Sequence, residues 1–391
     1  MPKPVVTLVQ YSGMRDGAAL SALAIGEGFR KRGCELQLVF GTTGEAFELS
    51  KQRGYNTHLW EHKNWLRDQR IIGFLKNYYQ ESSSSRSKPL LKLLQSNRTD
   101  LVYINTLASL GAAMAASRNH SPCIWHIREQ FQEDGGELRA PKLVKTLLPR
   151  LWKRFTNAFV FNTHAAKDSM FGNRIGGQVI PVGISDSFGE KQIPTDQCRS
   201  ILKLPQKATL IGIPGGLRKV KGHDWFLRAT SNWLVSTPSI HVAFAGIGSE
   251  TITNELRQLV ATFGLNGRIH FLGSVEKMQT FYQSCNLICI PSRGESFGRC
   301  AVEAMASRVP VVASAVGGLK EIIQHGENGM LVSFADDQGL VSALNHMLNN
   351  LDVTAKMVNQ AHQDFTRLYT ESVYQDSICD YAFNVWQQSK S

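Results

Sequence analysis

The sequence has no apolar run that is long enough to cross a lipid bilayer. Its longest weakly polar stretch, Leu107 to Ala116, falls short of the roughly 20 residues that a membrane-spanning helix needs. Near the N-terminus, Gln10, Arg15 and Asp16 interrupt the apolar residues, which argues against a secretory signal peptide. We therefore expect a cytoplasmic protein that either stays in solution or attaches at the inner face of a membrane.

Several other common signals are also missing. The 7 cysteines are an odd and scattered set, which fits a reducing cytosol and suggests no metal site. The turn Gly246-Ile-Gly248 lacks a third glycine at Thr251, so a dinucleotide oxidoreductase is disfavoured. No basic and aromatic platform and no zinc-ligand spacing occur, so we expect no nucleic-acid partner.

Positive charge is in excess, with a formal net charge of +11. Residues 138–155 hold six basic side chains and no acidic one; these are Arg139, Lys142, Lys145, Arg150, Lys153 and Arg154. Apolar residues alternate with them, so the stretch is amphipathic if it is helical, with a kink at Pro149. Two interpretations remain: peripheral contact with an anionic membrane, or a core helix with a solvated basic face.

The length and the apolar pattern predict two domains. A chain of 391 residues exceeds what one core usually serves. Short apolar runs alternate with helical periodicity twice along the chain, which predicts two doubly wound parallel sheets. In the first half we expect strands at 5–10, 35–40, 57–60, 100–105, 123–127 and 158–161, and the second set starts at Thr209, with strands near 241, 269, 287, 309 and 330.

The most informative stretch runs from Pro291 to Met330. A buried strand at its start delivers Glu295 onto a turn, from which a helix runs to Ser307. A helix N-terminus presents unpaired N–H groups and the positive end of its dipole, which favour a diphosphate. Glu303 lies two turns into this helix and can accept hydrogen bonds from two ribose hydroxyls. Alternatively, Glu303 forms an (i, i+4) pair with Arg299 on a solvated helix face.

Four further segments accompany this stretch, namely Leu210-Ile-Gly-Ile-Pro-Gly-Gly-Leu-Arg-Lys-Val-Lys-Gly-His-Asp-Trp, Val242-Ala-Phe-Ala-Gly-Ile-Gly-Ser-Glu, Ile269-His-Phe-Leu-Gly-Ser-Val and Trp125-His-Ile-Arg-Glu. Together they resemble the retaining GT-B glycosyltransferases of family 4, most strongly from Thr209 to Val332. The resemblance implies two Rossmann-like domains that face a central cleft. Residues 1–185 would bind the acceptor, residues 186–371 the nucleotide-sugar donor, and the helix at 372–391 would cross back to the first domain.

The resemblance also assigns roles to individual residues of the second domain. It implies that Lys221, Phe297 and Gly298 bind the donor diphosphate, that Glu303 binds the ribose and that Glu295 binds hydroxyls of the transferred sugar. The segments next to the base contain Gly246, Gly248, Ser274 and Val275. Where the family usually has a diphosphate-binding arginine, this chain has Gly216, so Arg218 or Lys219 would have to replace it.

In the first domain the resemblance points to a histidine and a glycine-rich loop. His126 would orient the transferred sugar; the alternative is a buried histidine whose partners are structural. Gly13 and Gly17 would let the backbone approach the donor phosphates or the acceptor, and an ordinary tight turn is the alternative. The serines at 82–85 predict a surface loop, either plain or a lid over the acceptor.

These features indicate a retaining hexosyltransferase that acts on a glycan or lipid-linked acceptor in cell-surface polysaccharide or glycolipid synthesis. No two aspartates are separated by a single residue, so the chain lacks an Asp-x-Asp metal motif, and we expect neither metal nor cofactor. An epimerase or phosphorylase on the same fold, or a degenerate non-catalytic subunit, remains an alternative. The sequence does not specify the base, the sugar, the acceptor or the oligomeric state.

Overall fold

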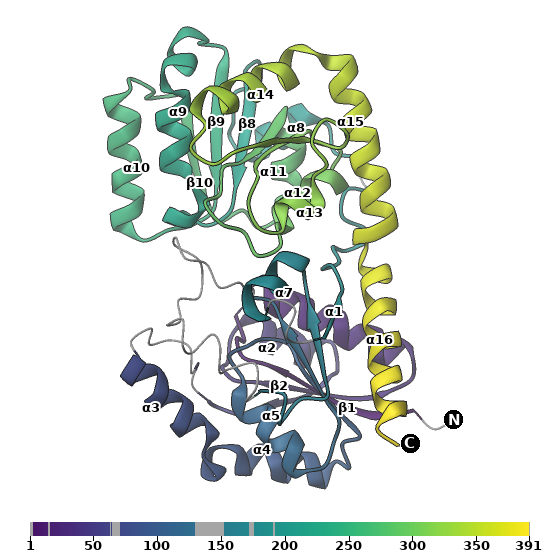
Figure 1. Cartoon of the computed structure of the whole chain (residues 1–391). Coiled ribbons are helices and arrows are strands. Elements are labelled where there is room, and N and C mark those ends of the chain that lie inside the picture. The colour runs from purple at the N-terminus through teal and green to yellow at the C-terminus, as the bar shows by residue number, and fades with distance from the viewer. Residues whose placement is uncertain are drawn as a thin grey trace. The chain divides into compact units, whose positions relative to one another are not determined.

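A computed structural model describes residues 3–14, 16–62, 64, 71–129, 152–171, 176–190 and 192–390. The chain forms two compact units, which are shown in Figure 1. Unit 1 comprises Met1–Gly183 and Glu371–Ser391, and unit 2 comprises Ile184–Thr370. Most of the predicted basic stretch, residues 138–151, lies outside the described residues, whereas Trp152 is buried and Lys153 and Arg154 are exposed.

Unit 1 is built on a parallel sheet of seven strands in the order β3-β2-β1-β4-β5-β6-β7. The strands are β1 (Val5–Gln10), β2 (Glu35–Phe40), β3 (Asn56–Leu59), β4 (Leu101–Ile104), β5 (Cys123–Ile127), β6 (Ala158–Phe161) and β7 (Gln178–Val179). Helices cover both faces of such a sheet, so its inner strands are buried along their whole length, as in β4 and β5. The strand order reverses between β1 and β4, which places a switch point at the carboxyl ends of these two strands.

The helices of unit 1 are α1 (Gly17–Lys31), α2 (Glu45–Gln52), α3 (Ile71–Ser82), α4 (Ser84–Ser96), α5 (Leu110–Arg118), α7 (His164–Phe171) and α16 (Glu371–Gln388). The prediction of a surface loop at residues 82–85 is wrong, because only Ser83 separates α3 from α4. Leu90 and Leu94 of α4 are buried in the core. Packing therefore holds the start of α4 in a helix despite its serine-rich composition.

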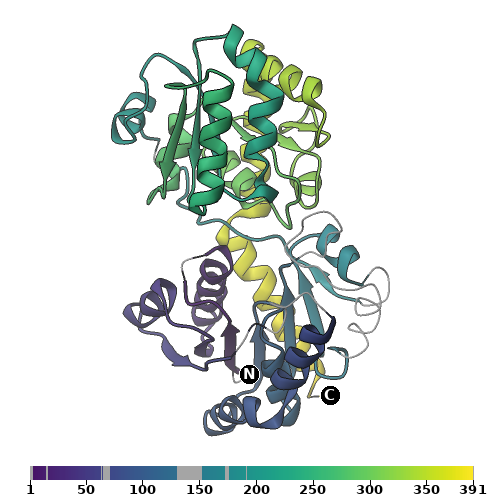
Figure 2. The same cartoon turned by 90° about the vertical axis from the view of Figure 1, so that its left-hand side faces the viewer.

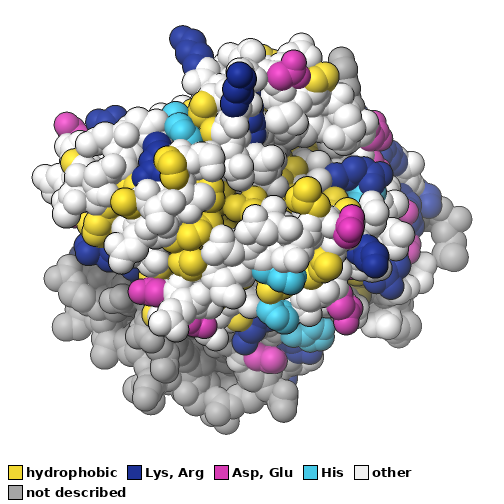
Figure 3. Space-filling view, turned by 90° about the horizontal axis from the view of Figure 1, so that it is seen from above, with side chains coloured by type: hydrophobic (Ala, Val, Ile, Leu, Met, Phe, Trp, Pro, Cys, Tyr) yellow, Lys and Arg dark blue, Asp and Glu magenta, His cyan; other side chains and the backbone are white. Residues whose placement is uncertain are grey.

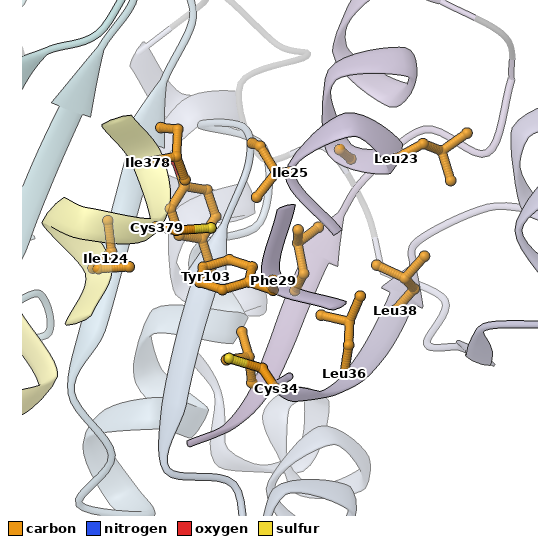
Figure 4. Close-up of a cluster of buried hydrophobic side chains, with 14 of the residues drawn as sticks. Leu23, Ile25, Phe29, Cys34, Leu36, Leu38, Tyr103, Ile124, Ile378 and Cys379 are labelled. Atoms are coloured by element: carbon orange, nitrogen blue, oxygen red, sulfur yellow. The ribbon is translucent and has the colours of Figure 1, made fainter. Parts of the chain in front are cut away.

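The last helix, α16, packs on α1 within unit 1 (Figures 1 and 4). Ile378 and Cys379 of α16 join the cluster of buried side chains that includes Phe29 and Tyr103. A Cβ added at Gly28 of α1 would lie 2.9 Å from the Cβ of Gln375, so the helices approach each other closely there. Unit 1 is thus formed by two parts of the chain, and the residues of unit 2 lie between them in the sequence.

Unit 2 holds a parallel sheet of six strands in the order β10-β9-β8-β11-β12-β13. The strands are β8 (Thr209–Pro214), β9 (Ile240–Ala245), β10 (Ile269–Gly273), β11 (Leu287–Ile290), β12 (Val311–Ser314) and β13 (Met330–Val332). The helices are α8 (Thr195–Ile201), α9 (His223–Ser236), α10 (Glu250–Thr262), α11 (Met278–Ser284), α12 (Arg299–Ala306), α13 (Leu319–Ile322), α14 (Asp337–Asn349) and α15 (Leu351–Asp364). The prediction of two doubly wound parallel sheets is therefore confirmed.

Among the described residues, no helix is both long and apolar enough to cross a bilayer. On the face shown in Figure 3, apolar side chains lie across the middle, and basic and acidic side chains are spread among neutral ones. On this face the positive charge of the chain is not gathered into a single patch.

Candidate functional site

Two loops at the carboxyl ends of neighbouring strands bring Lys221 and Glu295 together in unit 2. Lys221 ends a short 3-10 turn, Lys219–Lys221, after β8, and Glu295 lies in the turn after β11. Lys221 Nζ donates to Glu295 Oε2 at 2.6 Å, and Ser292 Oγ donates to the same oxygen at 3.4 Å. The two side chains of the ion pair are 14% and 16% exposed. The pair is thus largely desolvated but still reachable from solvent.

The charge on Lys221 is retained at this site. Burial opposes the ammonium form, but the charge and the hydrogen bond of the Glu295 carboxylate outweigh it and raise the pKa of Lys221 above its usual value. A desolvated cation attracts an anion much more strongly than an exposed one does. Lys221 can therefore hold a negatively charged ligand group in place of the carboxylate.

Glu303 lies on α12 and has two partners of its own. Tyr282 Oη, from α11, donates to Glu303 Oε2 at 2.8 Å, and Arg299 Nε donates to Glu303 Oε1 at 2.7 Å. The (i, i+4) pair with Arg299 therefore forms. The pair does not lie on a solvated helix face, as the alternative interpretation of Glu303 required, because Glu303 is buried and only 7% exposed. Each carboxylate oxygen accepts a hydrogen bond, which orients the group.

Cys300 connects the two acidic residues, and sequence reasoning missed it. Its thiol interacts with Lys221, Glu295 and Glu303, and it shares a hydrogen bond with Tyr282. Burial, together with the charge of Glu303, raises the pKa of Cys300 to about 12. The thiol is therefore neutral at pH 7. Cys300 and Glu303 lie three residues apart on one side of α12, and the charge of Lys221 acts on Cys300, so the three residues lie in the same part of unit 2.

Glycines allow the start of α12 to pack tightly. Gly298 precedes the helix with φ +110, and a Cβ there would lie 2.7 Å from Leu319 Cδ2. A Cβ at Gly318 would lie 2.4 Å from the carbonyl oxygen of Phe297, and the Gly318 N–H donates to the Glu295 carbonyl at 2.9 Å. The turn that carries Glu295 is thereby fixed at the positive end of the α12 dipole.

The loop after β8 places the side chains of Arg218 and Lys219, the two candidates to replace the missing arginine, in different surroundings. A Cβ at Gly216 would lie 3.9 Å from Arg218 Nε. The positive charge of Arg218 also acts on Lys221, where it opposes part of the rise in the pKa of the lysine. Lys219 is 71% exposed, and its Nζ lies 3.5 Å from Glu255 Oε2. Of the two candidates, Arg218 is therefore the one that lies near both Gly216 and Lys221.

The predicted base-binding residues lie on neighbouring loops. Gly246 forms a β-bridge with Gly273, which directly precedes Ser274 and Val275. A Cβ at Gly246 would lie 2.2 Å from the Gly215 carbonyl oxygen, and one at Gly248 would lie 2.6 Å from Leu217 Cβ. Loop packing alone thus accounts for both glycines of this turn. Contact of the four predicted residues with a base stays a prediction.

His126 in unit 1 has the contacts of a structural residue. It is 0% exposed, and its Nδ1 and Nε2 lie 2.9 Å from Tyr103 Oη and 2.7 Å from Asn162 Oδ1. Burial, aided by the charge of Arg128, holds the pKa of His126 well below its usual value. Both ring nitrogens thus have partners inside the core. A contact of His126 with the transferred sugar stays a prediction.

Gly13 is also explained by packing. Its N–H donates to Thr42 Oγ1 at 2.9 Å, its carbonyl accepts from the Ala46 N–H at 2.8 Å, and a Cβ there would lie 2.2 Å from the Thr42 carbonyl oxygen. Gly17 is the first residue of α1. Glycine at position 13 thus serves a close approach between two protein loops, and ligand contact by either glycine stays a prediction.

A polar cluster at the carboxyl edge of the first sheet was not predicted. Arg128 Nη1 donates to Ser21 Oγ at 2.7 Å, to Asn105 Oδ1 at 3.2 Å and to Tyr374 Oη at 3.3 Å. Glu129 accepts from the Leu107 N–H at 3.1 and 3.2 Å. The signal in the sequence that could have indicated this cluster is that Arg128 and Glu129 directly follow the strand that carries His126.

Within the part of the chain that the structure describes, no group of three or more acidic, histidine or cysteine side chains could hold a metal ion.

Comparison with known proteins agrees with this architecture. The sequence model of the family Glycosyltransferase Family 4 matches residues 15–188, and that of Glycosyl transferases group 1 matches residues 208–350. D-inositol 3-phosphate glycosyltransferase of Corynebacterium urealyticum is 31% identical over 186 residues, which are 46% of this chain and 44% of that protein. Lipopolysaccharide core biosynthesis mannosyltransferase LpcC of Rhizobium leguminosarum bv. viciae is 37% identical over 142 residues, 34% of this chain and 39% of that protein.

The matched region thus covers about half the length, or less, of these curated relatives. Among solved structures, Anabaena HepE in complex with UDP and glucose superposes with a TM-score of 0.81 at 22% identity, covering 97% of this chain and 99% of that one. This likeness shows a shared GT-B fold. With two family models matching successive parts of the sequence, the chain belongs to glycosyltransferase family 4, the glycosyl transferases of group 1.

Proposed function

We propose that this chain is a retaining glycosyltransferase that works without a metal ion and moves a hexosyl unit from a nucleotide diphosphate-sugar to a glycan or lipid-linked acceptor. The observation that carries the proposal is the desolvated contact between Lys221 and Glu295 beside Glu303. Membership of the family supports the activity. The name of the Rhizobium relative supports cell-surface glycolipid or polysaccharide synthesis as the setting.

The geometry suggests how the donor would be held. Breaking a glycosyl–phosphate bond leaves negative charge on the departing diphosphate, and fixed positive groups stabilise that charge. Lys221, with Arg218 and the start of α12 near Gly298, would supply them. The diphosphate would replace Glu295 as the partner of Lys221, and the released carboxylate would accept hydrogen bonds from hydroxyls of the transferred sugar. Donor binding and sugar recognition would thus be coupled through one ion pair.

The ribose would bind at Glu303. Arg299 and Tyr282 already fix this carboxylate, so little side-chain entropy remains to be lost when hydroxyls approach it. The missing arginine at Gly216 is the feature that favoured a degenerate, non-catalytic subunit. The position of Arg218 beside Gly216 weakens that alternative, because a guanidinium is still present near Lys221.

A thermal-shift panel tests the donor site. We expect at least one of UDP, GDP and ADP to raise the melting temperature more than its monophosphate does, because a ligand that binds only the folded chain stabilises it and the diphosphate is the group recognised. Replacing Arg218 with alanine should reduce this shift, while the exposed Lys219→Ala, one residue away, should retain it. The proposal fails if no nucleotide shifts the melting temperature, or if monophosphates act as strongly as diphosphates.

A further inference from the structure

The carboxylate of Glu303 is enclosed on one side and accessible on the other. Tyr282 of α11 covers the side of Oε2; it is 0% exposed, and its hydroxyl lies 2.8 Å from that oxygen. Burial holds the pKa of Tyr282 well above its usual value, so the phenol keeps its proton at pH 7 and is the donor in this bond. Arg299 holds the other oxygen, Oε1, and 30% of its side chain is exposed. A ligand therefore reaches Glu303 from the side of Arg299.

The guanidinium of Arg299 keeps hydrogen-bonding capacity for such a ligand. Arg299 lies on α12, which packs with α11 on one side of the sheet of unit 2, whereas α9 and α10 lie on the other side (Figures 1 and 2). Its Nε donates to Glu303 at 2.7 Å, and it has no further hydrogen-bond partner among the described residues. The N–H groups on Nη1 and Nη2 thus remain available. Because the guanidinium is rigid and planar, the bond at Nε also limits the directions in which they point.

A hydroxyl is the ligand group that suits this arrangement. The Glu303 carboxylate can only accept hydrogen bonds, and the Arg299 guanidinium can only donate them. A phosphate would be attracted by Arg299 but repelled by Glu303. A hydroxyl donates its proton to the carboxylate and accepts from an N–H of the guanidinium at the same time, so it satisfies both partners of the ion pair.

We propose that Arg299, together with Glu303, binds a ribose hydroxyl of the donor nucleotide and makes the site selective for ribonucleotides over deoxyribonucleotides. This role rests on the donor site proposed above. It gives Arg299 a direct contact with the ligand in addition to its part in orienting Glu303. A deoxyribose would leave both charged groups without their ligand partner, and hydrogen bonds to charged groups contribute more than those between neutral groups.

Calorimetric titration of the full chain tests this proposal. The probes are the nucleoside diphosphate that binds best, among UDP, GDP and ADP, and its 2′-deoxy and 3′-deoxy analogues. We expect at least one analogue to bind about tenfold or more weakly than the ribonucleotide, which corresponds to about 1.4 kcal/mol. Arg299→Met keeps an unbranched side chain but removes the charge and the donors. In this variant the difference should shrink to less than about threefold.

Tyr282→Phe is the matched control, because it removes the other hydrogen bond to the same carboxylate, from its enclosed side. It should lower the selectivity less than Arg299→Met does, whereas a purely orienting role of Arg299 predicts equal losses in the two variants. Arg299 is partly exposed, so its replacement should leave the fold intact. The melting temperature of each variant checks this.

Three results would overturn the proposal and leave the donor site in place. The first is equal binding of the ribonucleotide and both deoxy analogues to the wild-type chain. The second is full selectivity in Arg299→Met. The third is an equal loss of selectivity in Arg299→Met and Tyr282→Phe, which would assign Arg299 to orientation alone. Binding of no nucleoside diphosphate at all would instead overturn the donor site, and the role of Arg299 with it.

Discussion

Replacing Lys221 with alanine should lower the rate of donor turnover about a hundred- to a thousandfold, the usual effect of removing one group that stabilises charge in a transition state. The ammonium is largely desolvated, so water replaces it poorly. The substitution also leaves Glu295 without its ion-pair partner, which should lower the melting temperature. Release of nucleoside diphosphate from the nucleotide-sugar that binds best measures the rate.

Lys219→Ala is the matched control for this prediction. Lys219 belongs to the same 3-10 turn, but it is 71% exposed and pairs with Glu255 at the surface. An exposed pair of this kind contributes little, so the control should keep its rate and its melting temperature. Equal turnover by Lys221→Ala and the wild-type chain would remove the basis of the proposed mechanism.

Replacing Gly222 with alanine should lower the free energy of unfolding by about 3 kcal/mol or more, the sum of a left-handed backbone penalty and forced repacking. Gly222 has φ +72, and an added Cβ would lie 1.8 Å from the carbonyl oxygen of Pro291. That contact is with backbone, so a side-chain rotation cannot relieve it. Urea unfolding followed by circular dichroism measures the change.

Gly264→Ala separates the two causes. Gly264 has φ +66, but an added Cβ meets nothing within 4 Å, so only the backbone penalty of about 1–2 kcal/mol applies. Gly222→Ala should also reduce donor binding, because the clash pushes the loop of Lys221 away from the loop of Glu295. Equal destabilisation by the two substitutions would show that the contact with Pro291 has no energetic importance.

The fold was largely predictable because strands of a parallel sheet are covered on both faces. Continuous apolar runs such as the one in β4 then mark the strands directly. Prediction was weaker where packing overrode composition, as at the serines that begin α4. The strand β7 is only two residues long, too short to leave a periodic pattern.

The candidate site was only partly predictable, for reasons that differ between its residues. Lys221, Glu295 and Glu303 stand in motifs whose local structure follows from the sequence. Tyr282 reaches Glu303 from another helix, a tertiary contact that leaves no local pattern. The position of Arg218 depends on the bend of the loop at Gly215, which has φ +115. The sequence left two roles open for His126, because a strand end looks the same in sequence whether its side chain is enclosed or meets a ligand.

A crystal structure of the chain with the nucleoside diphosphate that stabilises it most tests the central claim directly. We predict an oxygen of the β-phosphate within about 3 Å of Lys221 Nζ, the distance of a charge-assisted hydrogen bond. The ribose hydroxyls should lie against the carboxylate of Glu303. A diphosphate bound elsewhere, with the contact between Lys221 and Glu295 intact, would contradict the account.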